Sequence, residues 1–243
     1  MGGRGSDVAR EASSLVLLDD NFTSIVAAVR MGRRIYANLK KAMAYIISVH
    51  VPIAGLSLAP VLLGWPLILL PVHIVFLELV IDPSCSVVFE MEPGEPGIMN
   101  RPPRPPEERI LDRQATGIAL AQGAGVLAVV LAVYLSAVSR GLTPDETRTL
   151  TFVTIVIANL ALIAVNLSWS ESVLSTLRAP NRAFWVVTGG TLFFLAVAVG
   201  LPAVREIFRF APLHPVDLAV CILAGTVSVL WFEVYKMAGP GRR

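Results

Sequence analysis

The chain has 243 residues, of which 55% are hydrophobic, with a mean hydropathy of +0.69 and a formal net charge of +2. This composition excludes an ordinary soluble domain of this length, because such domains contain far fewer apolar residues. The basic residues flank apolar stretches and do not form one patch. The charge therefore predicts no nucleic-acid partner, and the partner that the sequence does predict is the lipid bilayer.

The N-terminal segment, residues 1–20, is too short for a core of its own. Asp19 or Asp20 at its end is predicted to cap a helix by accepting the free N–H groups of the first turn. Apolar residues recur at helical spacing after this point, and basic residues crowd toward residue 41. We expect a stalk helix over 21–41 that continues into the membrane.

Six apolar stretches follow, each long enough to cross about 30 Å of hydrocarbon as a helix. They cover residues 42–63, 67–91, 115–139, 150–169, 183–204 and 216–236. The stretches are continuously apolar and lack the alternation of a transmembrane barrel. The sequence therefore predicts an all-α membrane protein with six transmembrane helices.

The distribution of Lys and Arg predicts the orientation. All but four of the 20 basic residues lie in segments on the same side as the N-terminus, and the exceptions are Arg140, Arg148, Arg205 and Arg209. By the positive-inside rule both termini, including the tail 238–243, are cytoplasmic. We expect a multi-pass protein of the plasma (inner) membrane.

Two connections differ in character. The outer connection at 64–66 is so short that the first two spans should form a tight antiparallel hairpin. The loop 92–114 is rich in Pro and Gly and is expected to be an extended cytoplasmic connector.

Two carboxylates lie inside the second span. Glu78 and Asp82 are four residues apart, which places both side chains on one helix face. Counting from Glu90, Asp82 lies about 12 Å deep and Glu78 about 18 Å deep. An unpaired charge at mid-bilayer costs at least about 2.5 kcal/mol, so something must compensate these two.

A cation is the compensator that the neighbouring residues favour. Pro83 removes the amide that would bond the Leu79 carbonyl, and Pro52 does the same for the Ser48 carbonyl in the first span. We expect both helices to be distorted at this depth, where His50 also lies. Carboxylates, free carbonyls and an imidazole can together supply part of the shell of a hard cation.

A structural alternative remains open for the same residues. Glu78 and Asp82 can be protonated, or can be hydrogen-bonded to the amides of Asn159, Asn166 or Gln122 as a packing device. His50 can simply bond a backbone carbonyl.

Two long segments resemble a known family. "GSDVAREASSLVLLDDNFTSIVAAVRMGRRIYANLKKAMAYIIS" resembles the end of the phosphorylation domain and the fifth stalk helix of P-type cation-transporting ATPases of the calcium and sodium/potassium pump type. "IMNRPPRPPEERIL" resembles the loop between their sixth and seventh membrane helices. The resemblance implies that residues 1–20 are the edge of the phosphorylation (HAD-like) domain and that the six spans, 42–237, are membrane helices five to ten.

The resemblance also bears on the site. Glu78 and Asp82 match the family's two cation ligands on its sixth helix, and His50 falls where the fifth helix presents an amide or hydroxyl ligand. Ile53 replaces the fifth-helix glutamate of two-site calcium pumps, and the fourth span carries no carboxylate. The resemblance therefore implies transport of one cation, a divalent such as Ca²⁺.

Other family segments are not in the sequence. The phosphorylated DKTGT motif, the Mg²⁺-binding GDGVNDA segment and the PEGLP-like break of the fourth helix are absent. By this resemblance the chain alone should not hydrolyse ATP. ATP and Mg²⁺ belong to the complete pump, and the partner is the missing N-terminal part, with membrane helices one to four and the ATPase domains. The alternative is a standalone passive six-helix protein, either a cation leak or a regulatory subunit of another transporter.

Overall fold

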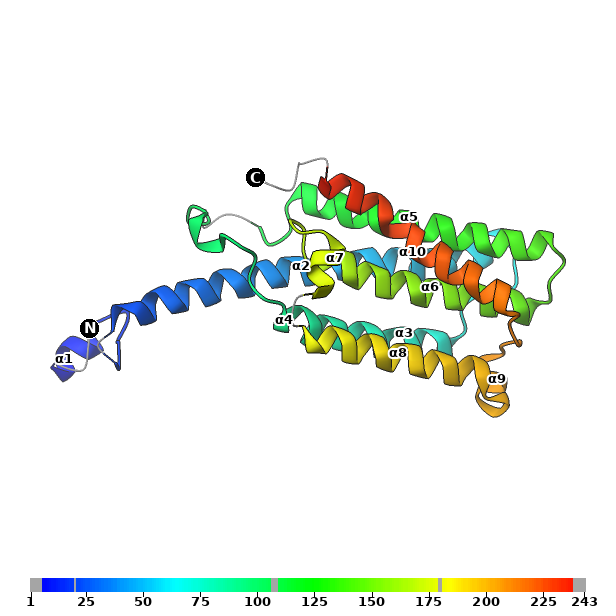
Figure 1. The fold of residues 1–243 in the computed structure, drawn as a ribbon, viewed down its shortest axis with the longest axis horizontal. Helices are drawn as coiled ribbons and strands as arrows, with labels where there is room; N and C mark the ends of the chain where they lie inside the picture. Colours follow the sequence, from blue (N-terminus) through cyan, green and yellow to red (C-terminus); the bar gives the residue numbers. More distant parts are fainter. Residues whose placement is uncertain (1–5, 20, 106–108, 179–180, 238–243) are drawn as a thin grey trace.

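The computed structural model describes residues 6–19, 21–105, 109–178 and 181–237, and every regular element in these ranges is a helix (Figure 1). The α-helices are α1 (Asp7–Glu11), α2 (Phe22–Leu63), α3 (Pro71–Pro83), α4 (Phe89–Met91), α5 (Arg113–Ser139), α6 (Pro144–Asn166), α7 (Val173–Arg178), α8 (Arg182–Gly200), α9 (Pro202–Phe208) and α10 (Pro215–Met237). A π-helical segment, Ser84–Val88, joins α3 to α4, and Ile98–Asn100 forms a 3₁₀ turn. Six helical stretches are long and apolar enough to cross a membrane, which confirms the predicted all-α fold with six spans.

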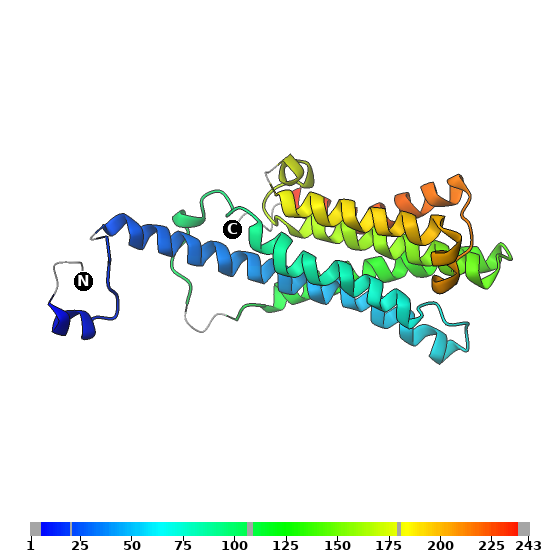
Figure 2. The ribbon, with the colours of Figure 1, turned by 90° about the horizontal axis from the view of Figure 1, so that it is seen from below.

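The predicted stalk and first span form one helix, α2, of 42 residues. Its N-terminal half extends beyond the other long helices in both views (Figures 1 and 2). The cap differs from the prediction: Asn21 caps α2 by accepting a hydrogen bond from the amide of Thr23 at 2.9 Å. Asp19 instead accepts from the Asn21 amide and the Ser24 hydroxyl, and Asp20 lies outside the described residues.

Several predicted ends move by a few residues because proline sets helix starts. The second span begins at Pro71 and not at 67, and the fourth begins at Pro144 and not at 150. The helix of the fifth span ends at Gly200, and Pro202 opens the separate helix α9. In the segment 1–20, the described part holds only α1, which buries no residue. The predicted tail 238–243 lies outside the described residues.

Helix α6 is the centre of the bundle. Most of its apolar window is buried, whereas the other spans bury less than half of theirs. Three of its threonines, Thr149, Thr151 and Thr154, are compatible with this burial because their hydroxyls donate to carbonyls one turn earlier. Thr151 donates to Thr147 at 2.7 Å and Thr154 donates to Leu150 at 2.8 Å. The buried hydroxyls of Thr151 and Thr154 are therefore hydrogen-bonded within α6.

The outer ends of α3 and α9 are joined by a buried histidine. His73 is fully buried, and its ring stacks on Phe210 with the centroids 5.0 Å apart. Nδ1 accepts from the Leu70 amide at 3.0 Å, so Nε2 donates to the Phe208 carbonyl at 2.9 Å. The ring therefore caps the start of α3 and also holds the end of α9.

We expect His73→Ala to lower the free energy of unfolding by about 2–4 kcal/mol, because it leaves a cavity and two unpaired backbone groups. Thermal unfolding of the purified chain in detergent measures the effect. His214→Ala is the matched control, because His214 is exposed. Equal melting temperatures for the two variants would show that His73 does not hold these helices together.

Candidate cation site

The structure brings His50 of α2 next to Glu78 of α3. Nε2 of His50 lies 3.8 Å from Oε1 of Glu78, and both side chains are about half exposed. Nδ1 of His50 contacts the Ile46 carbonyl at 2.8 Å. A carbonyl can only accept, so Nδ1 carries the proton and, in a neutral ring, Nε2 has a free lone pair.

The distance between His50 and Glu78 is compatible with an ion pair of a protonated imidazole and also with two groups around one cation. The separation of 3.8 Å is too long for an ordinary hydrogen bond. Two ligand atoms, each about 2.4 Å from one Ca²⁺, lie no more than about 4.8 Å apart, so both atoms can contact one ion. The prediction that the first span lies next to Glu78 is confirmed. The predicted tight hairpin is wrong, because the connection covers residues 64–70 and α2 packs mainly against α5 and hardly touches α3.

Asp82 lies one turn from Glu78, toward the end of the bundle from which the stalk extends, here called the stalk end. Its side chain is exposed. The expected distortion is present on this helix, because α3 ends at Pro83 and the π-helical segment begins at Ser84. Ser86 donates its hydroxyl to the Asp82 carbonyl at 2.7 Å. Extra π-helical turns are frequent at functional sites, and this one widens the helix directly after Asp82.

Helix α2 differs from α3, because it continues as an α-helix through Pro52. The distortion expected at Pro52 therefore does not interrupt the first span, and Pro52 provides no N–H for the Ser48 carbonyl. The Ser48 carbonyl lies against α5, where a Cβ added to Gly123 would come within 2.6 Å of it. Ser48 is buried whereas His50 is exposed, so this carbonyl and His50 lie on different sides of α2.

The buried amides form their own network behind the site. Gln122 Oε1 accepts from the Ser48 hydroxyl and from Asn166 Nδ2, both at 3.0 Å. Asn159 is buried, and its amide has no hydrogen-bond partner among the described residues. The amides that the structural alternative offered to the carboxylates therefore bond elsewhere or remain unpaired in the described part of the chain.

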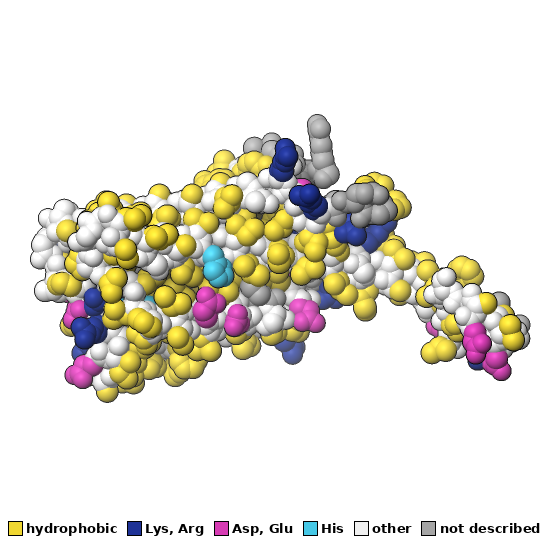
Figure 3. Space-filling view, turned by 180° about the vertical axis from the view of Figure 1, so that it is seen from behind, with side chains coloured by type: hydrophobic (Ala, Val, Ile, Leu, Met, Phe, Trp, Pro, Cys, Tyr) yellow, Lys and Arg dark blue, Asp and Glu magenta, His cyan; other side chains and the backbone are white. Residues whose placement is uncertain are grey.

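The face that carries the site is open and mostly hydrophobic. Figure 3 shows a histidine and acidic side chains near one another on such a face. Within the described ranges, no group of three His, Cys, Asp or Glu side chains is arranged to hold a metal ion. His50 and Glu78 alone would therefore be an incomplete shell for a cation, which would need Asp82, backbone carbonyls or further ligands.

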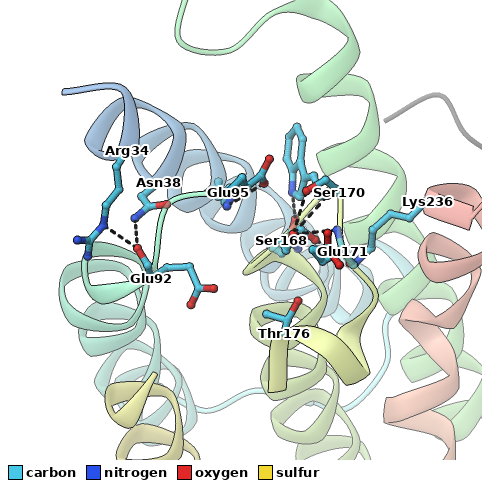
Figure 4. A network of polar contacts seen from close by, with 12 residues as sticks. Arg34, Asn38, Glu92, Glu95, Ser168, Ser170, Glu171, Thr176 and Lys236 are labelled. Atoms are coloured by element: carbon cyan, nitrogen blue, oxygen red, sulfur yellow. Dashed lines mark hydrogen bonds and ion pairs between the residues drawn. The ribbon is translucent and has the colours of Figure 1, made fainter. Parts of the chain in front are cut away.

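The stalk is fastened to the loop that follows the second span. Arg34 Nε and Asn38 Nδ2 of α2 donate to the Glu92 carbonyl at 2.9 and 2.8 Å (Figure 4). Asn181, which caps α8, donates to the Glu92 carboxylate at 2.6 Å. Burial raises the pKa of Glu92, and the bond from Asn181 opposes this shift. Glu92 therefore ties α2, the end of the second span and the start of α8 into one unit.

A multi-pass helical membrane protein that places an imidazole and a carboxylate side by side within its spans has the features of a cation-transport protein. The family described as "Cation transporting ATPase, C-terminus" matches residues 66–238. The chain belongs to this family.

The curated relatives are calcium pumps by name. The chain is 30% identical to the "Calcium-transporting ATPase" of Bacillus subtilis (strain 168) over 227 residues, which are 91% of this chain and 25% of that protein. It is 30% identical to "Calcium-transporting ATPase 1" of Lactococcus lactis over 236 residues, 96% of this chain and 26% of that protein. A shorter match, 41% over 111 residues, covers 45% of this chain and 12% of "Calcium-transporting ATPase 1" of Bacillus cereus. The chain spans about a quarter of the length of the first two relatives.

Proposed function

We propose that this chain is the membrane cation-transporting part of an ATP-driven pump and that it carries one divalent cation, Ca²⁺. The cation binds between α2 and α3 and is held by His50, Glu78 and Asp82, with the Leu79 carbonyl as a further oxygen ligand. The Ser48 carbonyl stays a weaker candidate, because it lies at the contact with α5.

The distance between His50 Nε2 and Glu78 Oε1 is the observation that carries the proposal. Two side chains that are costly in a membrane lie at a separation that one ion can bridge, and the contact of Nδ1 with the Ile46 carbonyl leaves Nε2 of the imidazole for an ion. The names of the curated relatives favour Ca²⁺ as this ion. Carboxylate oxygens suit this hard cation, and the remaining ligands come from the membrane helices that such a pump adds at the open face.

The stalk supplies a route by which ATP-driven movement reaches the site. Residues 22 and 50 belong to one unbroken helix and lie about 42 Å apart along it. A displacement of the stalk therefore tilts the segment that carries His50, and the Glu92 junction carries the displacement to α8. Tilting changes the distance between His50 and Glu78, which switches the site between tight and weak binding.

In this proposal ATP and Mg²⁺ are used by the rest of the pump, and the phosphorylated aspartate lies there as well. The stalk end faces the cytoplasm, because most basic residues lie on that side, and the membrane is the plasma membrane.

A chimera tests the proposal. This chain replaces the matching C-terminal quarter of the Bacillus subtilis calcium-transporting ATPase, and ATP hydrolysis is measured in membranes over a range of free Ca²⁺. We expect Ca²⁺-stimulated hydrolysis. If a chimera that is inserted and folded hydrolysed ATP at the same rate with and without Ca²⁺, the assignment would be contradicted.

The passive alternative makes the opposite prediction for the chain by itself. We expect liposomes that contain only this chain to show no Ca²⁺ or Na⁺ flux above that of protein-free liposomes, because the site is a partial shell and the inner helix α6 is tightly packed. A dye that reports the entrapped ion measures the flux. Rapid flux without ATP would favour a leak pathway over a pump.

A further inference from the structure

A second polar site lies at the stalk end of the bundle. A cavity of about 260 Å³ opens there, between the base of the stalk, the loop after α4, the start of α5 and the end of α10. None of His50, Glu78 and Asp82 lines it. Its charged lining residues are Lys40, Lys41, Arg101, Lys236, Glu95 and Asp112. We call it the stalk-end cavity.

Two of its lysines are buried, which is costly without full compensation. Lys41 and Lys236 are 4% and 7% exposed. Lys41 Nζ lies 3.0 Å from the Glu95 carboxylate, and Arg101 contacts the same carboxylate at 3.1 Å. One buried carboxylate is therefore shared between two cations. Burial opposes the ionisation of Glu95, yet these two cations lower its pKa, so the carboxylate is charged and its acceptors are in use.

The other carboxylates are also committed. Asp112 lies 2.8 Å from Lys40 Nζ but also caps α5, accepting the Ala115 amide at 2.6 Å. Lys236 pairs with Glu233, and its ammonium donates to the carbonyls of Val165 and Ser168 at 3.0 Å. Four cations thus meet three carboxylates around the cavity, which leaves an excess of positive charge.

Two further arginines lie nearby, and the Glu92 carboxylate beside Arg34 and Lys41 offsets part of their charge. Arg33 donates to the carbonyls of Ile98 and Arg101, and Arg34 donates to those of Glu90 and Glu92. Backbone carbonyls satisfy their hydrogen bonds but do not neutralise their charge. Among the side chains that line the stalk-end cavity, the basic ones outnumber the acidic ones, and this excess of positive charge would stabilise an anion that entered it.

The remaining lining indicates what kind of anion fits. Tyr235 accepts a hydrogen bond from Gln114 at 3.3 Å, which leaves its own O–H able to donate. Phe232, Ile118 and Trp169 form an apolar side of the cavity. Lys236 and Lys41 contribute charge, but their ammonium groups are committed to other partners. Lys40, Arg101 and the Tyr235 hydroxyl still have N–H or O–H groups to donate. Such donors suit an anion with several acceptor oxygens, and the apolar side suits the organic group attached to it.

We propose that the stalk-end cavity binds a phosphate group, carried either by an anionic phospholipid headgroup or by a small soluble phosphate compound. Basic pockets between membrane helices on the cytoplasmic side are suited to anionic headgroups. Figure 4 shows Glu95, Ser170 and Lys236, which come from three segments that are distant in the sequence, at this end of the bundle. A bound phosphate links the stalk to α10.

The two sources are separated by two probes on the full chain. In detergent, thermal unfolding is measured with inorganic phosphate and with sodium chloride at the same ionic strength. In a second arm, the chain is reconstituted into phosphatidylcholine nanodiscs that contain phosphatidylglycerol, and retained lipid is identified by native mass spectrometry. We expect either a phosphate-specific rise in melting temperature or retention of phosphatidylglycerol over phosphatidylcholine. The first result identifies a soluble phosphate compound as the ligand, and the second identifies an anionic phospholipid.

A charge-matched pair of variants decides whether the cavity is responsible. Lys40→Gln/Arg101→Gln removes two charges from the cavity lining, and we expect phosphate or phosphatidylglycerol to bind about ten-fold more weakly. Arg104→Gln/Arg113→Gln removes two charges from exposed side chains at the same end that do not line the cavity. This control should bind like the unaltered chain.

The proposal is overturned if neither probe binds, or if both double variants lose binding equally, which would indicate general surface attraction. Circular dichroism shows whether the cavity variant is folded. Should it not fold, Tyr235→Phe removes only a hydroxyl, and we expect binding about three-fold weaker than for the unaltered chain. Unchanged binding in a folded Tyr235→Phe variant would also count against the assignment.

Discussion

Asp82→Asn is expected to abolish Ca²⁺-stimulated phosphorylation of the chimeric pump at Ca²⁺ concentrations that saturate the unaltered chimera. The change keeps the shape of the side chain and removes its negative charge, so a loss reports on ion binding and not on packing. Loss of one charged ligand should weaken Ca²⁺ binding by at least about ten- to hundred-fold. The measurement is the Ca²⁺ concentration that gives half-maximal phosphorylation by radiolabelled ATP.

Glu90→Gln is the matched control for this variant. Glu90 is exposed on the same membrane-spanning segment as Asp82, beyond the π-helical segment toward the stalk end. The control removes the same charge two turns away and should leave the half-maximal Ca²⁺ concentration unchanged. If Asp82→Asn also left it unchanged, Asp82 would not be a ligand, and the site would reduce to His50 and Glu78.

Much of the helical framework could be predicted from the sequence, because each span must satisfy its own backbone in lipid. The residues at which the helices begin and end were harder to predict from the sequence. The cap at Asn21 was missed because Asp19, Asp20 and Asn21 are all good capping residues, and only the tertiary structure decides among them. Pro71 and Pro144 could have shown the true helix starts, since proline is favoured in the first turn.

The candidate site was predictable only in part. The structure confirms that His50 lies near Glu78, but not the tight hairpin from which this was predicted, since α2 packs mainly against α5. The direction of the Ser48 carbonyl does not follow, because it depends on the rotation of α2 against α5. That rotation is set by Gly123, which lies more than seventy residues further along the chain.

The stalk-end cavity was beyond prediction for a related reason. Its lining comes from α2, the loop after the second span, α5, the segment after α6, and α10. The cluster of Lys40 and Lys41 was visible in the sequence as a membrane-flanking basic pair. Lys236 lies beside this pair only because α10 packs there, and the three lysines then line one cavity.

Gly123→Ala is expected to force α2 and α5 apart. A Cβ at this position would lie 2.6 Å from the Ser48 carbonyl oxygen and 2.6 Å from the Val51 Cβ. The first of these atoms belongs to the backbone and cannot turn aside, so α2 must move away from α5. Small residues allow such close helix approach in membranes, and this one has no spare room.

The movement would also break the bond between Ser48 and Gln122, which is adjacent to the contact. We expect the free energy of unfolding to fall by about 1–3 kcal/mol, because overpacking strains a contact that has no void to absorb it. In the chimera, the half-maximal Ca²⁺ concentration should rise, since His50 moves with α2. Thermal unfolding in detergent and the phosphorylation assay measure the two effects.

Gly117→Ala on the same helix is the matched control. A Cβ at Gly117 meets nothing within 4 Å, so the change adds a methyl group to α5 in open space. Alanine favours the helix over glycine by up to about 1 kcal/mol, and the control should therefore unfold at the same or a higher temperature than the unaltered chain. Because both variants make the same chemical change in the same helix, their difference isolates the approach of α5 to Ser48. If Gly123→Ala were as stable as Gly117→Ala, the two helices would not be in the close contact that fixes the rotation of α2 and the position of His50.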